Sequence, residues 1–230
     1  ADSNISSIPD MLKKAEVPYV LIYNQPSTCE HPTITVDNIG AGREVAKLLI
    51  ELGHERLGMV AGQFLASDRA DARRDGFIDG AAEHGLTEPI VIEVDFVSPR
   101  LERTLAPIYA ERETAPSALF CSNDLLAISV IGALGRLGLY VPKDVSVIGF
   151  DGIAVGTHLH PTLATVIQPS YEMGRAATRQ LLDRLAGKDC PMTEILPHKL
   201  RIGESAGPAA KLSPAFLINS NQKKQWRPSK

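Results

Sequence analysis

Val-Ser-Val-Ile-Gly-Phe-Asp, residues 145–151, is the stretch that decides the fold of this 230-residue chain. An almost unbroken apolar run of this length predicts a strand that is buried on both faces, as the strands of parallel sheets are. The run ends on a carboxylate, so Asp151 is expected at the end of a buried strand, where it can reach a ligand.

Three earlier runs share this pattern of a short apolar strand followed by polar residues. They are Leu57–Ala61 before Gly62 and Arg73, Ile90–Val94 before Asp95–Phe96, and Ala118–Cys121 before Ser122–Asn123–Asp124. In open α/β sheets, ligands bind in the crevice beyond the carboxyl ends of the strands. The four runs together therefore predict a binding site that is assembled from separate strands.

The segments around these runs show helical periodicity or strand character. Helices are predicted over about 39–52, 72–84, 101–112, 125–137 and 171–186, and glycine follows several of them. Further strands are predicted at Val17–Tyr23, Ile34–Val36, Ala164–Gln168 and Ile195–Ile202. The alternation predicts βαβ units, and hence an α/β fold with parallel sheets and helices on both faces.

Charge is distributed unevenly along the chain. The net charge is -3, but residues 207–230 carry five basic residues and no acidic one, which leaves 19 basic against 27 acidic residues elsewhere. An acidic body is a poor surface for DNA phosphates, so contact with DNA is expected only through another segment. We predict that residues 207–230 form a basic tail or a partly ordered extension.

Neither a membrane span nor a disulfide framework is indicated. No stretch approaches the roughly 18 apolar residues that a membrane helix needs. Three widely spaced cysteines, Cys29, Cys121 and Cys190, indicate free thiols in a reducing compartment, which favours the cytoplasm.

Motifs for catalysis, cofactors and metals are incomplete. Gly40–Val45 resembles a dinucleotide fingerprint, but valine replaces its third glycine and no acidic residue ends the next strand. Gly203–Gly207 matches a nucleophile elbow, yet no Asp, Glu or His follows Ser205. His158 and His160 have no third ligand of the right type nearby. We therefore predict no catalytic residue, no cofactor and no metal.

Each candidate site residue also has a plainer interpretation. Arg73 could be a solvated helix arginine, and Ser122–Asn123–Asp124 could be only a helix cap. Asp151 could be a turn residue, and Phe96 could belong to the core. Their shared position near the carboxyl ends of strands favours the binding role over these alternatives.

Five ordered blocks between residues 37 and 169 make the chain similar to the lactose-repressor/galactose-repressor (LacI/GalR) family. The blocks are Gly53–Gly62, Arg73–Phe77, Ser122–Ala127, Gly138–Asp151 and Pro161–Pro169. The resemblance implies an effector-binding domain of the periplasmic-binding-protein-like fold (type I), in which a ligand lies between two α/β subdomains.

The resemblance also implies a division of the chain. Residues 1–37 and 168–197 would form part of the N-terminal subdomain, and residues 38–167 and 198–206 the C-terminal subdomain. The family's helix-turn-helix domain, its hinge helix and the first half of the N-terminal subdomain have no counterpart in this sequence. We therefore expect a fragment, an unusual gene product or a sequence that omits an upstream part.

Carried over position by position, the family's effector contacts fall on Arg73, Phe96, Asn123, Asp151 and Gln168, with Ser67 and Arg69 as further candidates. In these roles Arg73 would donate a planar fork, Asp151 would accept from hydroxyls, and Phe96 would stack on a sugar ring. The sequence departs from the family pattern at Gly152, Ala164 and Gly203, which leaves the identity of the ligand open.

The function that this resemblance implies is that of a ligand-binding regulatory domain in a transcriptional regulator. It would sense a small sugar-like effector and modulate DNA binding by a helix-turn-helix domain, as a homodimer and without a membrane. The alternative is a periplasmic sugar-binding protein of a transporter. A helix-turn-helix encoded upstream would favour the regulator, and a signal peptide there would favour the transporter.

Overall fold

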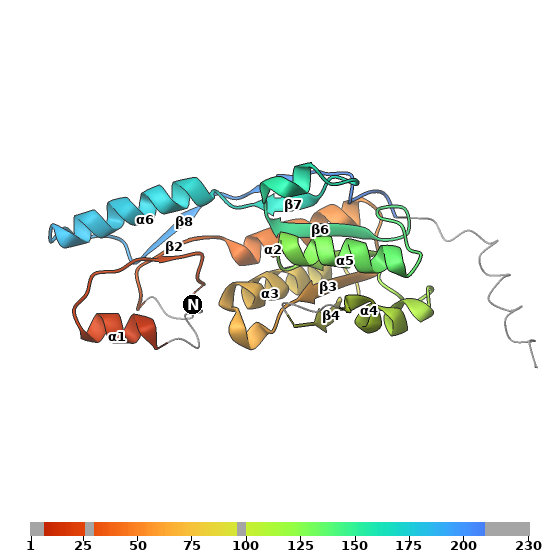
Figure 1. Cartoon of the computed structure of the whole chain (residues 1–230), viewed down its shortest axis with the longest axis horizontal. Coiled ribbons are helices and arrows are strands. Elements are labelled where there is room, and N and C mark those ends of the chain that lie inside the picture. Colours follow the sequence, from red (N-terminus) through yellow and green to blue (C-terminus); the bar gives the residue numbers. More distant parts are fainter. Residues whose placement is uncertain (1–6, 26–29, 96–99, 210–230) are drawn as a thin grey trace, which may run out of the picture.

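The structure is a computed structural model, and it describes residues 7–25, 30–95 and 100–209. The described strands form two sheets, which lie towards opposite ends of the molecule in Figure 1. The smaller sheet has the order β1-β2-β8, with β1 at Leu21–Ile22, β2 at Thr33–Val36 and β8 at Thr193–Leu196. The larger sheet has the order β4-β3-β5-β6-β7-β9, and its strands are β3 (Leu57–Ala61), β4 (Ile90–Glu93), β5 (Ala118–Cys121), β6 (Ser146–Asp151), β7 (Ala164–Ile167) and β9 (Lys199–Arg201).

Helices cover both faces of the larger sheet. One face packs against α2 (Asn38–Glu51) and α3 (Asp68–Glu83), and the other against α4 (Leu101–Ala110) and α5 (Asp124–Arg136). The smaller sheet contacts α6 (Ser170–Leu185), and α1 (Ile8–Lys14) precedes its first strand. Two short 3-10 helices, Phe64–Ala66 and Ala154–Thr157, follow β3 and β6. None of the described helices is both long enough and apolar enough to cross a bilayer.

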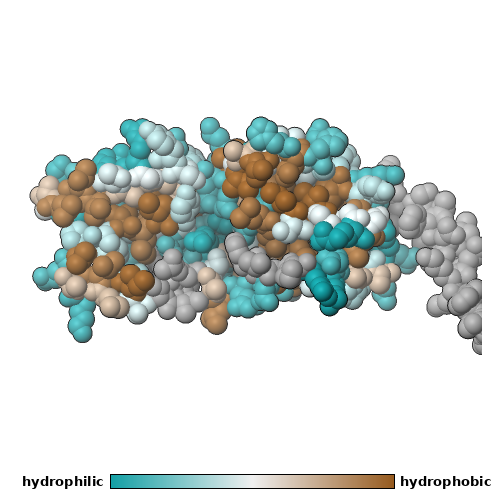
Figure 2. Space-filling view, viewed as in Figure 1, coloured by the Kyte–Doolittle hydropathy of each residue, from teal (hydrophilic) through white to brown (hydrophobic). Residues whose placement is uncertain are grey.

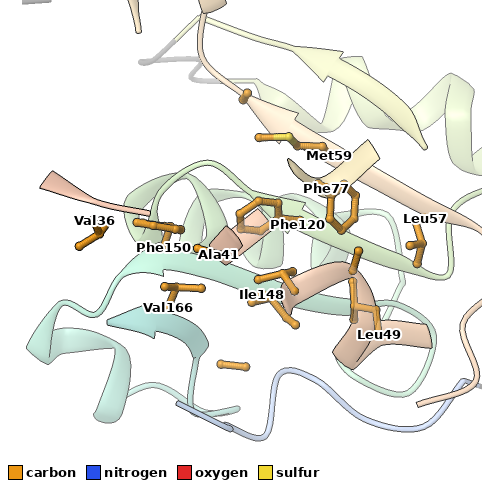
Figure 3. Close-up of a cluster of buried hydrophobic side chains, with 14 of the residues drawn as sticks. Val36, Ala41, Leu49, Leu57, Met59, Phe77, Phe120, Ile148, Phe150 and Val166 are labelled. Carbon is orange, nitrogen blue, oxygen red and sulfur yellow. The ribbon is translucent and has the colours of Figure 1, made fainter. Parts of the chain in front are cut away.

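The core of the larger sheet follows from alternation along its strands, because successive side chains of a strand point to opposite faces. Met59, Phe120 and Ile148 join the cluster beneath α2 and α3, which Figure 3 shows together with Phe77 of α3. Val60, Leu119 and Val147, which stand next to them in the sequence, join the cluster beneath α4 and α5. The apolar runs of the sequence are therefore buried on both faces, as the sequence predicts.

The chain passes between the two sheets three times. It leaves β2 for α2, β7 for α6, and β8 for β9. All strands of the smaller sheet lie within residues 1–37 and 168–197, and all strands of the larger sheet lie within the predicted C-terminal part. The division into two subdomains remains a prediction, and the three crossings place Gln168 and Pro197 at the junction.

Two strand predictions were wrong in detail. The segment Ile195–Ile202 is not one strand, because Pro197, which has no N–H to donate, separates β8 in the smaller sheet from β9 in the larger one. β9 also pairs antiparallel with β7, so the larger sheet is not purely parallel. Only Leu21–Ile22 of the predicted strand Val17–Tyr23 is paired, and it lies beside β2.

Gly42 of the dinucleotide-like stretch and Gly76 of α3 have a packing role. A Cβ atom at Gly42 of α2 would lie 2.4 Å from the carbonyl oxygen of Arg73, and one at Gly76 of α3 would lie 2.0 Å from the carbonyl oxygen of Ile39. Such distances are far below van der Waals contact, so both glycines are required for the close approach of the two helices. This approach fixes α3, and with it Arg73, against α2.

A buried polar network ties the end of the described chain to the larger sheet. His54 is 2% exposed, and its ring nitrogens lie 3.0 Å from Ser117 Oγ and 3.1 Å from Ser146 Oγ. Its Nε2 also lies 3.0 Å from the carbonyl oxygen of Gly207. Residues 207–209 are thus held at the sheet, whereas residues 210–230 of the predicted tail lie outside the described residues. The hydroxyl of Ser205 is buried and already engaged in a structural hydrogen bond, because it donates to the carbonyl oxygen of Val147.

His54 makes the stability of the fold depend on pH. Burial lowers the pKa of His54 from 6.5, because desolvation disfavours the charged ring, and this outweighs the hydrogen bond to Gly207. The unfolded chain therefore takes up a proton at a higher pH than the folded chain does. The contribution of His54 to stability is complete above pH 6.5 and declines as the pH falls below that value.

We expect His54→Gln to flatten the dependence of the free energy of unfolding on pH between neutral and mildly acidic conditions. Urea unfolding followed by circular dichroism across this range measures the effect. His158→Gln is the matched control, since His158 is exposed and its removal should leave the slope unchanged. An unaltered slope in His54→Gln would show that His54 does not carry this dependence.

Candidate functional site

A cleft of about 1310 Å³ lies between the two sheets. Hydrophilic residues line the recess between the hydrophobic areas at the two ends of the molecule (Figure 2). The larger sheet contributes the segments that follow β3, β5 and β6, and the other side of the cleft is formed by Tyr23 and the start of α6. Six of the seven predicted site residues line this cleft, namely Ser67, Arg69, Arg73, Asn123, Asp151 and Gln168. The seventh, Phe96, lies outside the described residues.

Arg73 is buried beneath the cleft instead of standing in solvent. Its side chain projects from α3, the residue is 2% exposed, and its guanidinium carbon lies 3.4 Å from the centre of the Phe150 ring. Nε donates to Asn38 Oδ1 at 2.9 Å, and Nη1 donates to the carbonyl oxygen of Ser122 at 2.6 Å. Nη2 is buried and has no partner among the described residues. Two hydrogen bonds and the Phe150 ring therefore fix the guanidinium, and Nη2 is left without a partner among the described residues.

The charge of Arg73 persists at neutral pH despite this burial. Desolvation lowers the pKa of Arg73 to about 9, and the carboxylate of Asp151 opposes the shift. A protonated guanidinium held over an aromatic face in a site of low polarity is a strong hydrogen-bond donor.

Asp151 and Gln168 form a pair at the junction of the two sheets. Gln168 Nε2 donates to Asp151 Oδ1 at 2.8 Å, while the buried Gln168 Oε1 has no partner among the described residues. Burial raises the pKa of Asp151, and Arg73 and Gln168 act in the opposite direction. Two residues that line the cleft therefore carry buried polar atoms without partners among the described residues, an acceptor on Gln168 and a donor on Arg73.

Asn123 and Ser67 are helix caps that also line the cleft, so the plainer interpretation of Asn123 as a cap holds for part of its side chain. Asn123 Oδ1 accepts from the amide of Leu126 at 2.8 Å, and Ser67 Oγ accepts from the amide of Ala70 at 3.3 Å. Capping uses the oxygen of Asn123 and leaves its Nδ2 group as a donor at the cleft. Arg69 lies at the same edge, and its charge lowers the pKa of Asp151.

A family model for a periplasmic binding protein-like domain matches residues 46–206 of this chain. The repressor PurR of Aliivibrio salmonicida is 33% identical over 191 residues, which are 82% of this chain and 56% of that protein. The chain belongs to the LacI/GalR family. It spans little more than half the length of the curated relatives that it matches.

Solved structures of LacI/GalR members agree with this assignment. A LacI-type regulator from Bacillus cereus subsp. cytotoxis is 27% identical with a TM-score of 0.81, and the match covers 89% of this chain and 73% of that one. A complex of the regulator CelR with cellobiose is 29% identical with a TM-score of 0.79, and that match covers 88% and 63% of the two chains.

Sequence reasoning missed several residues that line the cleft of this LacI/GalR domain or contact those that do. Asn38 orients Arg73, and Tyr23, Tyr171 and Lys199 line the cleft. Tyr23 has a φ of 72°, and Asp151 has a φ of 113°, so two cleft residues adopt a conformation that residues with a Cβ rarely adopt. Such strain clusters at functional sites. The local sequence does not predict that Tyr23 lines the cleft or that Asn38 contacts Arg73, because both positions depend on segments distant in the chain.

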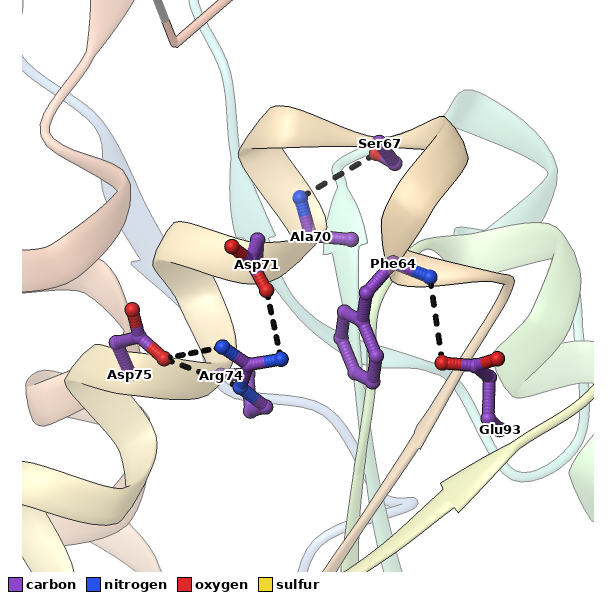
Figure 4. Close-up of polar contacts among 7 residues, drawn as sticks. All are labelled: Phe64, Ser67, Ala70, Asp71, Arg74, Asp75 and Glu93. Atoms are coloured by element: carbon purple, nitrogen blue, oxygen red, sulfur yellow. Dashed lines mark hydrogen bonds and ion pairs between the residues drawn. The ribbon is translucent and has the colours of Figure 1, made fainter. Parts of the chain in front are cut away.

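Arg74, the neighbour of Arg73, does not line the cleft. It pairs with Asp71 at 2.6 Å and with Asp75 at 2.7 Å, and its guanidinium lies over the Phe64 ring (Figure 4). The amide of Phe64 in turn faces Glu93 at the end of β4. Arg74 therefore steadies the segment that leads into α3 and the Ser67 cap.

The residues that line the cleft supply hydrogen-bonding groups. Within the described ranges, His, Cys, Asp and Glu side chains form no cluster of three or more that could hold a metal ion. The cleft residues include hydrogen-bond donors and acceptors, and groups of both charges. Such a lining suits a compact neutral ligand with several hydroxyl groups, since a hydroxyl both donates and accepts.

Proposed function

We propose that this chain is the effector-binding domain of a LacI-type transcriptional regulator and that its cleft binds a small sugar. The observation that carries the proposal is the pair of unsatisfied buried atoms, Arg73 Nη2 and Gln168 Oε1, on residues lining one cleft. Leaving a buried donor or acceptor unpaired costs about 1–3 kcal/mol, so a ligand that satisfies both is strongly favoured. Sugar hydroxyls meet both needs.

The relatives support a regulator more than a transporter protein. PurR of Aliivibrio salmonicida is a transcriptional repressor, and one structural neighbour is a regulator in complex with cellobiose. In the proposed function the domain binds and does not transform its ligand. It acts in the cytoplasm as a homodimer, and it reaches operator DNA through a helix-turn-helix domain outside these 230 residues.

In the proposed mechanism, the sugar changes how the two sheets are held relative to each other. Gln168 lies at a crossing between them, and Arg73 and Asp151 belong to the larger sheet and its helices. A ligand shifts such an equilibrium only through a difference in affinity between the two arrangements. Contacts made by residues from both sides of the cleft supply that difference.

A thermal-shift screen of the chain with D-ribose, D-glucose and cellobiose tests the proposal. A sugar present at about 100 times its Kd stabilises the folded state by about 2.7 kcal/mol, which raises the melting temperature. The increase should be clearly smaller in Asp151→Ala at the same sugar concentration. The proposal fails if none of the three sugars raises the melting temperature, or if the increase is the same in Asp151→Ala.

A further inference from the structure

Asp124 is a fully buried carboxylate that stands behind the cleft without lining it. It is the first residue of α5 and is 0% exposed. Its Oδ1 accepts from Thr165 Oγ1 at 2.5 Å, and its Oδ2 accepts from the amide of Ile153 at 2.8 Å. One carboxylate thus joins the start of α5, the middle of β7 and the turn that follows β6.

Capping of α5 does not explain this carboxylate. Asn123 already caps the helix by accepting from the amide of Leu126. Burial raises the pKa of Asp124, and the nearby charge of Asp151 raises it further, so the position is unfavourable for a charged group. A carboxylate does, however, offer two acceptor oxygens in different directions, which the contacts to Thr165 and Ile153 require.

The strand β6 is shaped to receive this side chain. A Cβ atom at Gly149 would lie 2.2 Å from Asp124 Oδ1, so any larger residue would displace the carboxylate. Gly149 pairs in register with Thr165, the residue that donates to the same oxygen. The carboxylate therefore rests directly on the β6–β7 pair, two residues before Asp151.

The turn that Asp124 anchors is the one that presents Asp151 to the cleft. Asp151 has a φ of 113° and Gly152 a φ of 76°, so two successive residues have positive φ. Only glycine tolerates this region freely, and a residue such as Asp151 stays there when its surroundings hold it. The contact of Asp124 with the amide of Ile153 fixes the turn immediately after these two residues.

We propose that Asp124 is a positioning residue that holds the 151–153 turn, and with it the carboxylate of Asp151, in the orientation that faces Gln168 and the cleft. The expected effect of Asp124 on sugar affinity rests on the proposed function. The expected effect of Asp124 on the geometry of the turn does not depend on any ligand.

A double-mutant cycle tests whether Asp124 acts through Asp151. The Kd values for D-ribose and cellobiose are measured by calorimetry for the chain, Asp124→Ala, Asp151→Asn and the double variant. We expect Asp124→Ala to weaken binding at least about tenfold in the chain but less than about twofold when Asp151 is already replaced, because coupled residues are not additive. The same loss in both backgrounds would overturn the inference.

Ser146→Ala is the matched control for loss of stability. Ser146 is buried at the start of β6, where its hydroxyl donates to the carbonyl oxygen of Gly207. This variant should lower the melting temperature and leave both Kd values within about twofold, because the site lies away from the turn. Thr165→Val, which replaces the hydroxyl that donates to Asp124 with a methyl group, takes the place of Asp124→Ala in the cycle if the latter does not fold.

A crystal structure of Asp124→Ala without sugar separates this inference from the proposed function. We expect φ of residue 151 to leave the positive region and the 2.8 Å contact between Gln168 and Asp151 to be lost. An unchanged turn would overturn the inference even if sugars bind. Failure of D-ribose and cellobiose to bind the unaltered chain, together with an altered turn in Asp124→Ala, would instead count against the proposed function.

Discussion

Replacing Arg73 with lysine is expected to weaken sugar binding by about tenfold to a hundredfold. A hydrogen bond from a charged donor contributes about 1.5–3 kcal/mol, and each 1.4 kcal/mol changes Kd tenfold. Arginine satisfies Asn38 and Ser122 with two nitrogens and retains Nη2. A lysine ammonium is a single point that cannot serve both partners and the cleft together. Calorimetry with the sugar that gives the largest thermal shift measures the loss.

Arg74→Lys is the matched control, one residue along the same helix. Its ion pairs with Asp71 and Asp75 are partly exposed, and such pairs contribute about 0–1 kcal/mol. Because Arg74 does not line the cleft, affinity should be unchanged. Equal affinities of Arg73→Lys and the unaltered chain would remove Arg73 from the site.

Arg73→Met should also lower the free energy of unfolding. It leaves Asn38 Oδ1 and the Ser122 carbonyl oxygen without a donor, at a cost of about 1–3 kcal/mol each.

Two replacements of Asp151, by alanine and by glycine, are expected to weaken sugar binding alike but to differ in stability. Asp151→Ala and Asp151→Gly both remove the carboxylate, so both should weaken sugar binding at least about tenfold. A φ of 113°, however, is unfavourable for alanine because of its Cβ atom, whereas glycine adopts it without a penalty. We expect Asp151→Gly to be more stable than Asp151→Ala by about 1 kcal/mol, the reverse of the usual order in helices.

Urea unfolding of the two variants provides the comparison, and both lose the same contact with Gln168. A more stable alanine variant would mean that the turn relaxes without cost once the carboxylate is gone. Binding that survives in both variants would show that the ligand does not depend on Asp151.

The helices and the buried strands of the larger sheet could be predicted because their signals are local. The periodicity of residues 39–52 predicted a helix that the structure places at Asn38–Glu51, with Asp37 as its cap. The apolar run ending at Asp151 became β6. Pro197 marks a possible break within Ile195–Ile202, because proline interrupts strand pairing. Which sheet each side of the proline joins could not be predicted, because it depends on strands that are distant in the sequence.

The cleft was predictable in outline but not in its contacts. Arg73, Asn123 and Asp151 follow strands whose carboxyl ends meet, which brought them to one site. Arg73 is buried against Phe150 and held by Asn38, and no local pattern predicts these contacts. They depend on the close packing of α2 and α3 at Gly42 and Gly76. Tyr23 reaches the cleft from the smaller sheet, and no local pattern predicts that position.

A crystal structure of the chain grown with the sugar that most raises its melting temperature tests the central claim most directly. We predict a sugar in the cleft with one hydroxyl on Arg73 Nη2 and another on Gln168 Oε1, two buried atoms of cleft residues that lack partners among the described residues. A sugar bound elsewhere on the surface, with both atoms still unpaired, would contradict the account.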